Sequence, residues 1–187
     1  MLALGTKAPA FALTDVTTQN LVTLDRVSDK KATLVMFIAN HCPYVQHVLP
    51  ELVRIGKEYE HSDLGIVAIS SNDAEAYPED SPEKMRLEAE NHGFAFPYLF
   101  DEDQDVAAAY TAVCTPDFFL FDDELKLVYR GRLDESRPRT DVPVTGRDLR
   151  DAIRSALGGG DPADTQFPSM GCSIKWKPGS EPEYLVS

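Results

Sequence analysis

The hydrophobic positions of the chain form short runs that alternate between strand-like and helix-like spacing. The runs 33–39 (TLVMFIA) and 64–70 (LGIVAIS) are continuously apolar and rich in branched residues, which is typical of strands buried on both faces. Between them, the segment 43–59 has apolar residues at helical spacing, with Pro43 in its first turn. Pro50 lies inside this segment and should kink the helix. The pattern predicts a strand–helix–strand unit with a parallel crossover.

The rest of the chain continues this alternation. We expect extended pieces at 10–14 and 21–24, a polar loop at 72–82, a helix at 82–91, a strand at 96–100, a helix from 105 to about 112, strands at 118–122 and 125–131, and a helix at 146–157. This order predicts a three-layer α/β domain over residues 1–160. We expect residues 161–187 to form a C-terminal extension that carries Cys172 and Trp176 and packs on the domain.

Composition and charge narrow the range of partners. The 187 residues have a formal charge of −13, which argues against nucleic acids and anionic membrane surfaces as partners. The longest apolar run, 32–39, is far shorter than the ~20 residues of a membrane-spanning helix. The N-terminus has no basic start followed by a long apolar stretch, so we expect a cytoplasmic protein. In a reducing compartment, its three cysteines are free or catalytic thiols.

Cys42 stands where a buried strand ends and a helix begins. At such a position, the unpaired backbone N–H groups and the helix dipole favour a thiolate. The carboxyl end of a parallel strand is also where α/β folds place their sites. A buried cysteine that only fills space is the alternative, but the polar neighbours Asn40 and His41 favour a reactive thiol.

Four features match one superfamily, in order along the chain. They are the N-terminal run 5–13 (GTKAPAFAL), Cys42-Pro43 at the helix start, Pro50 inside that helix, and Thr115-Pro116 before the strand 118–122. With them the chain resembles the thioredoxin superfamily, and more closely its peroxiredoxin-like (AhpC/TSA-type) branch, over residues 5–157. It is similar to a bacterial subgroup with Asn-His-Cys-Pro-Tyr-Val at the site and Gly-Cys-Ser-Ile-Lys-Trp-Lys-Pro-Gly near the end. The resemblance implies a thioredoxin-like α/β/α sandwich with an N-terminal β-hairpin extension and a cis bond before Pro116.

Three positions depart from the patterns of these relatives. Val45 occupies the second position of a C-x-x-C pair, so Cys42 cannot form the vicinal disulfide of a thioredoxin. Ala39 stands where the peroxiredoxin pattern has a Thr or Ser that holds the peroxide, and Met36 replaces the buried acid of thioredoxin. Neither mechanism transfers whole to this chain.

Two other cysteines are candidates for a second thiol. If Pro116 is cis, Cys114 lies beside the start of the Cys42 helix, where a disulfide requires Cα atoms within ~7 Å. Cys172 alternates with Ile174 and Trp176 on one face of the tail, and a tail laid across the site would offer it as a resolving thiol. Tail-borne resolving cysteines occur in the branch that the chain resembles, which favours Cys172. Each thiol could instead be simply packed.

Six residues are expected to line the substrate pocket: Asn40, His41, Pro43, Tyr44, Thr115 and Pro116. His41 could stabilise the Cys42 thiolate or relay a proton, or it could only line the pocket. His47 is expected at the surface. A metal site from His41, Cys42 and His47 is disfavoured, because adjacent His41 and Cys42 cannot easily face one ion.

We therefore expect a thiol-dependent oxidoreductase, of antioxidant type, that needs no cofactor or metal. Cys42 would attack a peroxide or a protein disulfide, and Cys172 or Cys114 would resolve the product. The resemblance implies an external thiol reductant, such as a thioredoxin or a glutathione-type system. A redox-sensing or client-binding module without turnover is the alternative, and copper delivery is a more distant one.

Overall fold

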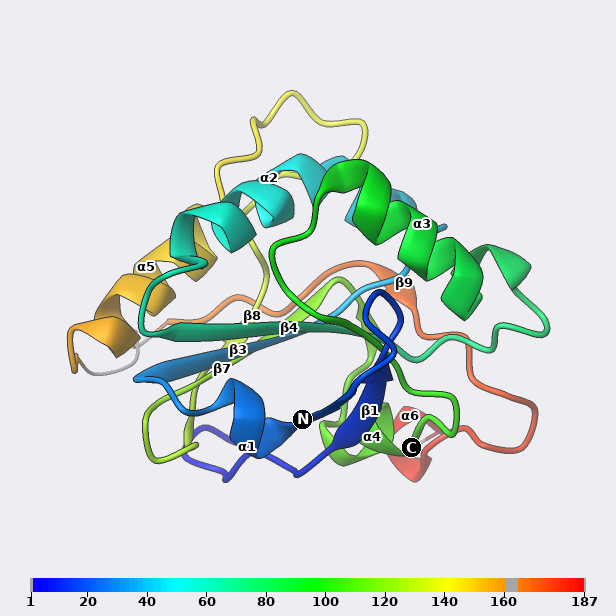
Figure 1. The fold of residues 1–187 in the computed structure, drawn as a ribbon. Helices are drawn as coiled ribbons and strands as arrows, with labels where there is room; N and C mark the ends of the chain where they lie inside the picture. Colours follow the sequence, from blue (N-terminus) through cyan, green and yellow to red (C-terminus); the bar gives the residue numbers. More distant parts are fainter. Residues whose placement is uncertain (1, 161–164, 187) are drawn as a thin grey trace.

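The computed structural model describes residues 2–160 and 165–186, and a seven-stranded mixed sheet forms its centre (Figure 1). The strands follow the order β2-β1-β5-β4-β3-β7-β8 across the sheet. Their bounds are β1 Ala12–Asp15, β2 Leu21–Thr23, β3 Ala32–Phe37, β4 Leu64–Ser70, β5 Tyr98–Phe100, β7 Asp117–Phe121 and β8 Leu127–Gly131. The predicted start of the tail at residue 161 lies outside the described residues.

The two apolar runs seen in the sequence are the central strands. β3 and β4 pair in parallel from Ala32↔Leu64 to Phe37↔Ile69, and every residue of both is buried. β5 continues the parallel arrangement beside β4, whereas β7 and β8 are antiparallel neighbours on the other side. The predicted N-terminal hairpin, β1 with β2, is present, and it joins the sheet edge because β1 also pairs with β5.

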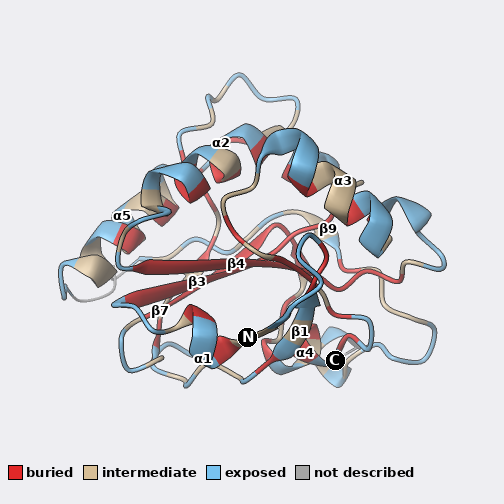
Figure 2. Cartoon of the chain, viewed as in Figure 1, coloured by how far each residue is buried: buried red, intermediate tan, exposed pale blue. Residues whose placement is uncertain are grey.

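Helices cover both faces of the sheet, which confirms the predicted thioredoxin-like α/β/α sandwich. On one face lie α2 (Pro43–Tyr59), α3 (Pro82–His92) and α5 (Arg147–Leu157); on the other lie α1 (Leu24–Val27), α4 (Asp105–Ala109) and α6 (Glu183–Val186), as Figure 1 shows. Each face has its own hydrophobic cluster, and the central strands β3, β4 and β7 between them are buried throughout (Figure 2). Within the described residues, no helix combines the length and the apolar character needed to cross a membrane.

Local backbone conformation moved several predicted boundaries. The helix expected to reach residue 112 ends at Ala109, because Thr111 takes a left-handed conformation with φ 51°. The strand expected from 125 starts at Leu127, because Leu125, with φ 58°, belongs to the preceding turn. Two helices were not predicted, α1 and α6, and the polar loop contains a single 3₁₀ turn, η1 (Pro78–Asp80). These elements are too short for a periodic pattern to be visible.

The described part of the tail runs from the edge of the sheet across the end of the domain. Phe167 first pairs with β8, where its carbonyl oxygen accepts a hydrogen bond from Arg132 N (3.0 Å). The strand β9 (Cys172–Ser173) then pairs antiparallel with β6 (Cys114–Thr115). The tail continues to α6, which lies under the sheet near α4 in Figure 1. Residues distant in sequence are thereby brought to the end of β3, where Cys42 lies.

Candidate active site

Cys42 is the N-cap residue of α2, and Pro43 occupies the first turn. Its thiol is 1% exposed and donates a hydrogen bond to Thr115 O at 3.1 Å. The side chain makes no capping hydrogen bond, so it does not use the free N–H groups of the first turn. These N–H groups and the dipole of a 17-residue helix favour a negative charge at this position. The geometry is that of a thiol set where its thiolate is stabilised.

The Thr115–Pro116 peptide bond is cis, as the resemblance implied. This bond joins β6 to β7, and β7 pairs with β3, the strand that leads to Cys42. Thr115 is buried, and its carbonyl oxygen is the acceptor for the Cys42 thiol. The structure therefore brings the two predicted segments, Asn40–Tyr44 and Thr115–Pro116, together around one sulfur atom.

Cys172 lies directly opposite Thr115 in the β6–β9 ladder. The pKa of its thiol is raised to about 11, because burial, a hydrogen bond with the Cys42 side chain and the charge on Cys42 all disfavour the Cys172 thiolate. The Lys175 charge and the Tyr44 backbone N–H act in the opposite direction. The tail thus brings a second thiol into contact with Cys42 at the start of α2.

Cys114 occupies a different environment on the neighbouring strand. It is 7% exposed, and its Sγ lies 3.7 Å from Pro116 O. Burial, followed by the charges on Asp117 and Cys42, raises the pKa of Cys114 to about 12. Asp117 is itself buried, forms an ion pair with Arg130 at 3.5 Å, and has a pKa raised by burial. Cys114 is therefore near the site but enclosed by the sheet.

His41 is held by an acid that the sequence analysis missed. Its ring Nδ1 and its backbone N–H both contact the Asp80 carboxylate, and the backbone bond measures 3.2 Å. Asp80 is fully buried, and Asn72 Nδ2 donates to its second oxygen at 2.7 Å. The His41 ring also stacks on Tyr77, with ring centroids 5.3 Å apart. No hydrogen bond found among residues 2–160 and 165–186 joins the His41 ring to Cys42.

Asp80 had no signal in the sequence because it lies in a polar loop without periodicity. Asn40 is tied to the same region: its side chain donates to Glu79 O at 3.0 Å and accepts from Tyr98 OH at 3.0 Å. These bonds position the loop that leads into Cys42. They connect it to α3 through η1 and to the core through Tyr98.

Comparison with known proteins places this site in a family. The pattern of the AhpC/TSA family matches residues 4–130, more than half of the chain. The chain belongs to the AhpC/TSA family. Among solved structures, it is similar to an uncharacterized conserved protein from Geobacillus kaustophilus, with 55% identity over 96% of this chain and 95% of that one and a TM-score of 0.94. A hypothetical protein from Sinorhizobium meliloti is 47% identical over 96% and 97%, with a TM-score of 0.93.

More distant similarity shows the fold alone. A putative thiol:disulfide interchange protein DsbE from Chlorobium tepidum is 21% identical over 84% of this chain and all of its own length, with a TM-score of 0.66. No curated protein matches the chain. The family and fold together are those of thioredoxin-like redox proteins.

The three positions that depart from the thioredoxin and peroxiredoxin patterns are buried in this AhpC/TSA member. Val45, at the second cysteine position, is 2% exposed and packs in the core between α2 and the sheet. Ala39 and Met36 pack in the same core. The position three residues after Cys42, where thioredoxins have their second cysteine, is thus part of the hydrophobic core. The thiol next to Cys42 comes instead from the tail, as Cys172.

The remaining pocket residues lie beside Cys42. Pro43 is exposed and Tyr44 is half-buried, and Tyr44 lines a narrow groove together with Pro116 and Met170. His47 is half-buried rather than at the open surface, and its Nε2 lies 2.7 Å from Ser136 Oγ. In the described parts of the chain, no group of three His, Cys, Asp or Glu side chains is arranged to hold a metal ion.

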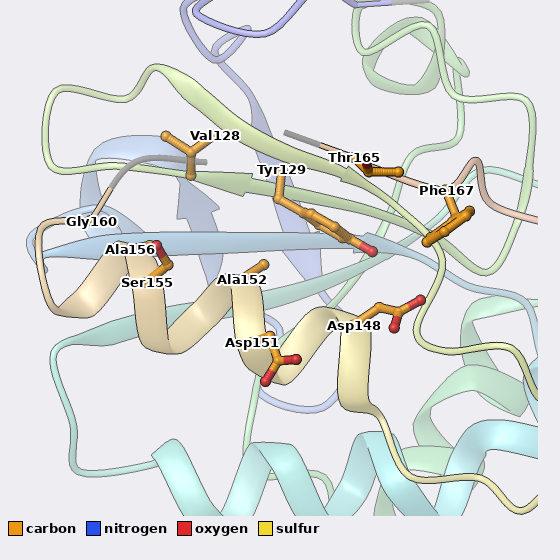
Figure 3. A pocket seen from close by; sticks show the side chains of 10 residues that line it. All are labelled: Val128, Tyr129, Asp148, Asp151, Ala152, Ser155, Ala156, Gly160, Thr165 and Phe167. Carbon is orange, nitrogen blue, oxygen red and sulfur yellow. The ribbon is translucent and has the colours of Figure 1, made fainter. Parts of the chain in front are cut away.

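A separate hollow lies between α5 and β8 (Figure 3). It has a volume of about 220 Å³ and shares no residue with the Cys42 site. Its polar side chains take part in the fold: Tyr129 OH donates to Arg132 O at 2.6 Å, and Asp148 pairs with Arg132 at 2.7 Å. The described residues that line this hollow include neither a cysteine nor any residue hydrogen-bonded to Cys42, so we assign it no part in the thiol chemistry.

Proposed function

We propose that the protein is a thiol-dependent oxidoreductase in which Cys42 is the nucleophile and Cys172 is the resolving thiol. The observation that supports this most directly is that Cys42 Sγ donates to Thr115 O at 3.1 Å, and Thr115 is the residue paired with Cys172 in the β6–β9 ladder. Membership of the AhpC/TSA family supports redox chemistry at this cysteine. Cys114 is the weaker candidate for resolution, because its thiol is enclosed in the sheet and its Sγ contacts Pro116 O.

With a hydroperoxide, two steps balance the reaction. The Cys42 thiolate attacks the terminal oxygen, so that an S–O bond forms, the O–O bond breaks and the alcohol leaves after taking a proton. The Cys172 sulfur then attacks the Cys42 sulfenic acid, forming the disulfide, while the hydroxyl leaves as water with the Cys172 proton. An external dithiol reduces the disulfide and is oxidised in turn.

With a disulfide substrate, the same two thiols act in the same order. Cys42 forms a mixed disulfide and releases one substrate thiolate, and Cys172 displaces the second while closing the Cys42–Cys172 bond. The structural neighbours named as thiol:disulfide interchange proteins favour this reaction, whereas the family favours peroxide. In both cases we propose that a thioredoxin- or glutathione-type reductant restores the thiols, in a reducing compartment such as the cytoplasm.

The surrounding residues have supporting parts in this proposal. Thr115 O accepts the Cys42 proton in a hydrogen bond and orients the thiol toward the tail. His41 and Asn40 hold the loop before Cys42 through Asp80 and Tyr98, so we assign them positioning roles. Pro43, Tyr44 and Pro116 form the surface that an approaching substrate meets.

Mapping the cysteines after oxidation tests the proposal. Fully reduced protein receives one equivalent of hydrogen peroxide or of a small aromatic disulfide, free thiols are blocked, and the bonds are identified by mass spectrometry. We expect a Cys42–Cys172 disulfide in the wild type and in Cys114→Ser, and no such bond in Cys172→Ser.

The other outcomes are equally informative. A Cys42–Cys114 disulfide would show that Cys114, and not Cys172, is the resolving residue. Stoichiometric oxidation without turnover, in the presence of a reducing system, would support a sensor in place of an enzyme. A Cys42 that reacts with neither oxidant would overturn the proposed function.

A further inference from the structure

The tail is bound to the domain as an extended strand, through its main chain. Cys172 and Ser173 pair with Thr115 and Cys114, and Ile174 N donates to Val113 O at 3.4 Å. Backbone pairing of this kind is how an extended peptide is held by β-strand addition. Cys42, whose thiol donates to Thr115 O beside this ladder, is 1% exposed.

Two buried amide side chains extend the contact beyond the ladder. Asn72 Oδ1 accepts a hydrogen bond from Lys175 N at 2.9 Å. Gln104 binds both sides of the next turn: its Nε2 donates to Lys175 O at 2.9 Å, and its Oε1 accepts from Lys177 N at 2.8 Å. Asn72 and Gln104 are 4% and 2% exposed. On the tail, these amides bind backbone atoms only, so they would hold any extended chain in this register.

Side-chain selection comes from two positions of the bound segment. A Cβ atom on Gly171 would lie 1.9 Å from Thr115 O, so no side chain fits there without moving the backbone. Ile174 is 3% exposed, whereas Ser173 is exposed. The surface thus selects glycine at position 171 and an apolar residue at position 174. Cys172 lies between them, and position 173 is exposed and accepts any residue. The charged tail residues Lys175 and Lys177 suit a domain whose chain has a net charge of −13.

We propose that Thr115, Asn72 and Gln104 form a binding site for an extended, basic polypeptide segment of the type Gly-Cys-x-apolar, and that the tail of the same chain occupies this site at rest. Another chain of this type can bind Thr115, Asn72 and Gln104 only by replacing residues 171–177, so the tail and such a partner exclude each other at this site. The inference depends on the proposed function only in that Cys42 is the reactive group to which the site leads. Tethering gives the tail an effective concentration of about millimolar, which a free segment must overcome.

A peptide tests the site without any thiol chemistry. The probe is a fluorescein-labelled peptide of residues 168–179 that carries Cys172→Ser, and binding is followed by fluorescence anisotropy. The full-length proteins are the wild type, two tail-releasing variants, Gly171→Val and Ile174→Asp, and the matched control Ser173→Val, an exposed position of the same strand. Circular dichroism tests whether each variant is folded. Two independent releasing variants are used so that the test can still be made if one of them does not fold.

We expect both releasing variants to bind the peptide at least about tenfold more tightly than the wild type and Ser173→Val. A peptide that carries Gly171→Val, and one with N-methylated backbone nitrogens at Lys175 and Lys177, should not bind. Equal affinity of the wild type and the folded releasing variants would overturn the inference, as would full binding of the N-methylated peptide. Because the peptide carries no thiol and forms no covalent bond with Cys42, an inert Cys42 would not change the result, and a failure to bind would leave the chemistry of Cys42 intact.

Discussion

Cys114 and Cys172 lie on paired strands, yet their environments differ. Cys114 is buried, and β6 leads through the cis bond into β7, one of the fully buried strands of the sheet. Next to it, the buried Asp117–Arg130 pair is stabilised further by Ser169, which donates to Asp117 at 2.7 Å. Cys172 is half-buried on a two-residue strand of the tail and contacts the Cys42 thiol.

The difference shows what a resolving thiol requires from the fold. A disulfide needs the two Cα atoms within ~7 Å and a suitable dihedral angle, so a thiol on a segment that can adjust its backbone reaches this geometry more easily. Cys114 is followed through the cis bond by β7 of the central sheet, whereas Cys172 lies on a tail segment held by a two-residue ladder and by hydrogen bonds from side-chain amides. We call Cys172 and β9 the tail side of the site, and Cys114 with β6 and β7 the sheet side. We expect Cys172 on the tail side to resolve oxidised Cys42, and the sheet side to provide a rigid support.

Removal of Cys42, the possible disulfide partner of both Cys114 and Cys172, should have the largest effect on activity. In Cys42→Ala, peroxide consumption should fall to the rate of buffer, because the nucleophile is absent. Neither Cys114 nor Cys172 should form a disulfide, since the thiol that peroxide oxidises first is absent and burial still raises the pKa of both remaining thiols. Peroxide assays and thiol mapping measure this. A Cys114–Cys172 disulfide formed at the wild-type rate would contradict the central role of Cys42.

Separate removal of the two flanking thiols tests the comparison directly. In Cys172→Ser, the intramolecular disulfide should be lost, and turnover with an external dithiol should fall by roughly 100-fold or more, since an intramolecular thiol has a large effective concentration. Cys114→Ser should stay within about twofold of the wild type. Steady-state rates and trapping of the Cys42 sulfenic acid measure both. The reverse order of effects would assign resolution to the sheet side.

Breaking the ion pair behind Cys114 measures the rigidity of the sheet side. Arg130→Met leaves the Asp117 carboxylate buried without its cation, which should cost about 3–5 kcal/mol of the free energy of unfolding at neutral pH. Because burial already raises the pKa of Asp117, protonation at lower pH should reduce this loss. Urea unfolding at two pH values measures it.

The matched control is Arg147→Met, which changes an arginine with 62% exposed side chain that pairs with Asp148. It should cost no more than about 1 kcal/mol. Similar losses for Arg130→Met and Arg147→Met would show that the sheet side is no more rigid than the surface.

The smallest expected effect is a change in the titration of Cys172. Its pKa of about 11 arises first from burial and then from the hydrogen bond and charge of Cys42. In Cys42→Ala both contributions of Cys42 are lost, while burial still raises the pKa and Lys175 and the Tyr44 backbone still lower it, so the pKa should fall toward its ordinary value of about 8.5. Alkylation of Cys172 by iodoacetamide, followed by mass spectrometry between pH 7 and 11, should therefore show its midpoint at lower pH in Cys42→Ala. An unchanged midpoint would indicate that the two thiols do not interact.

Three polar residues that hold the site in place, Asp80, Asn72 and Gln104, could not be predicted from the sequence, because their partners are far away along the chain. Asp80 binds His41 across 39 positions of the chain, and Asn72 binds Lys175 across 103. Gln104 stands in an acidic turn that the sequence suggests is a solvated loop, yet it is 2% exposed and binds the tail. A polar residue in a loop has the same local pattern whether it faces water or a distant backbone, so these three residues had no signal.

The tail illustrates the same limit. Alternation predicted that Cys172, Ile174 and Trp176 share one face, but Cys172 packs with the cluster on the α2 side, while Ile174 and Trp176 pack with the cluster on the opposite face of the sheet. The tail crosses from one layer to the other at the end of the sheet. Only the first two positions of this pattern, Cys172 and Ser173, form a strand.

The sequence by itself determined the central strands, the long helix and the place of Cys42 between them, because continuous apolar runs and helical spacing are local properties that record burial. Through its motifs, it also indicated the family and the cis bond before Pro116. Only the tertiary structure decided which thiol meets Cys42 and what holds the tail there. Those outcomes depend on hydrogen bonds and close approaches between segments far apart in the chain, such as Gly171 against Thr115, and such contacts exist only after the sheet and its two helical layers have formed.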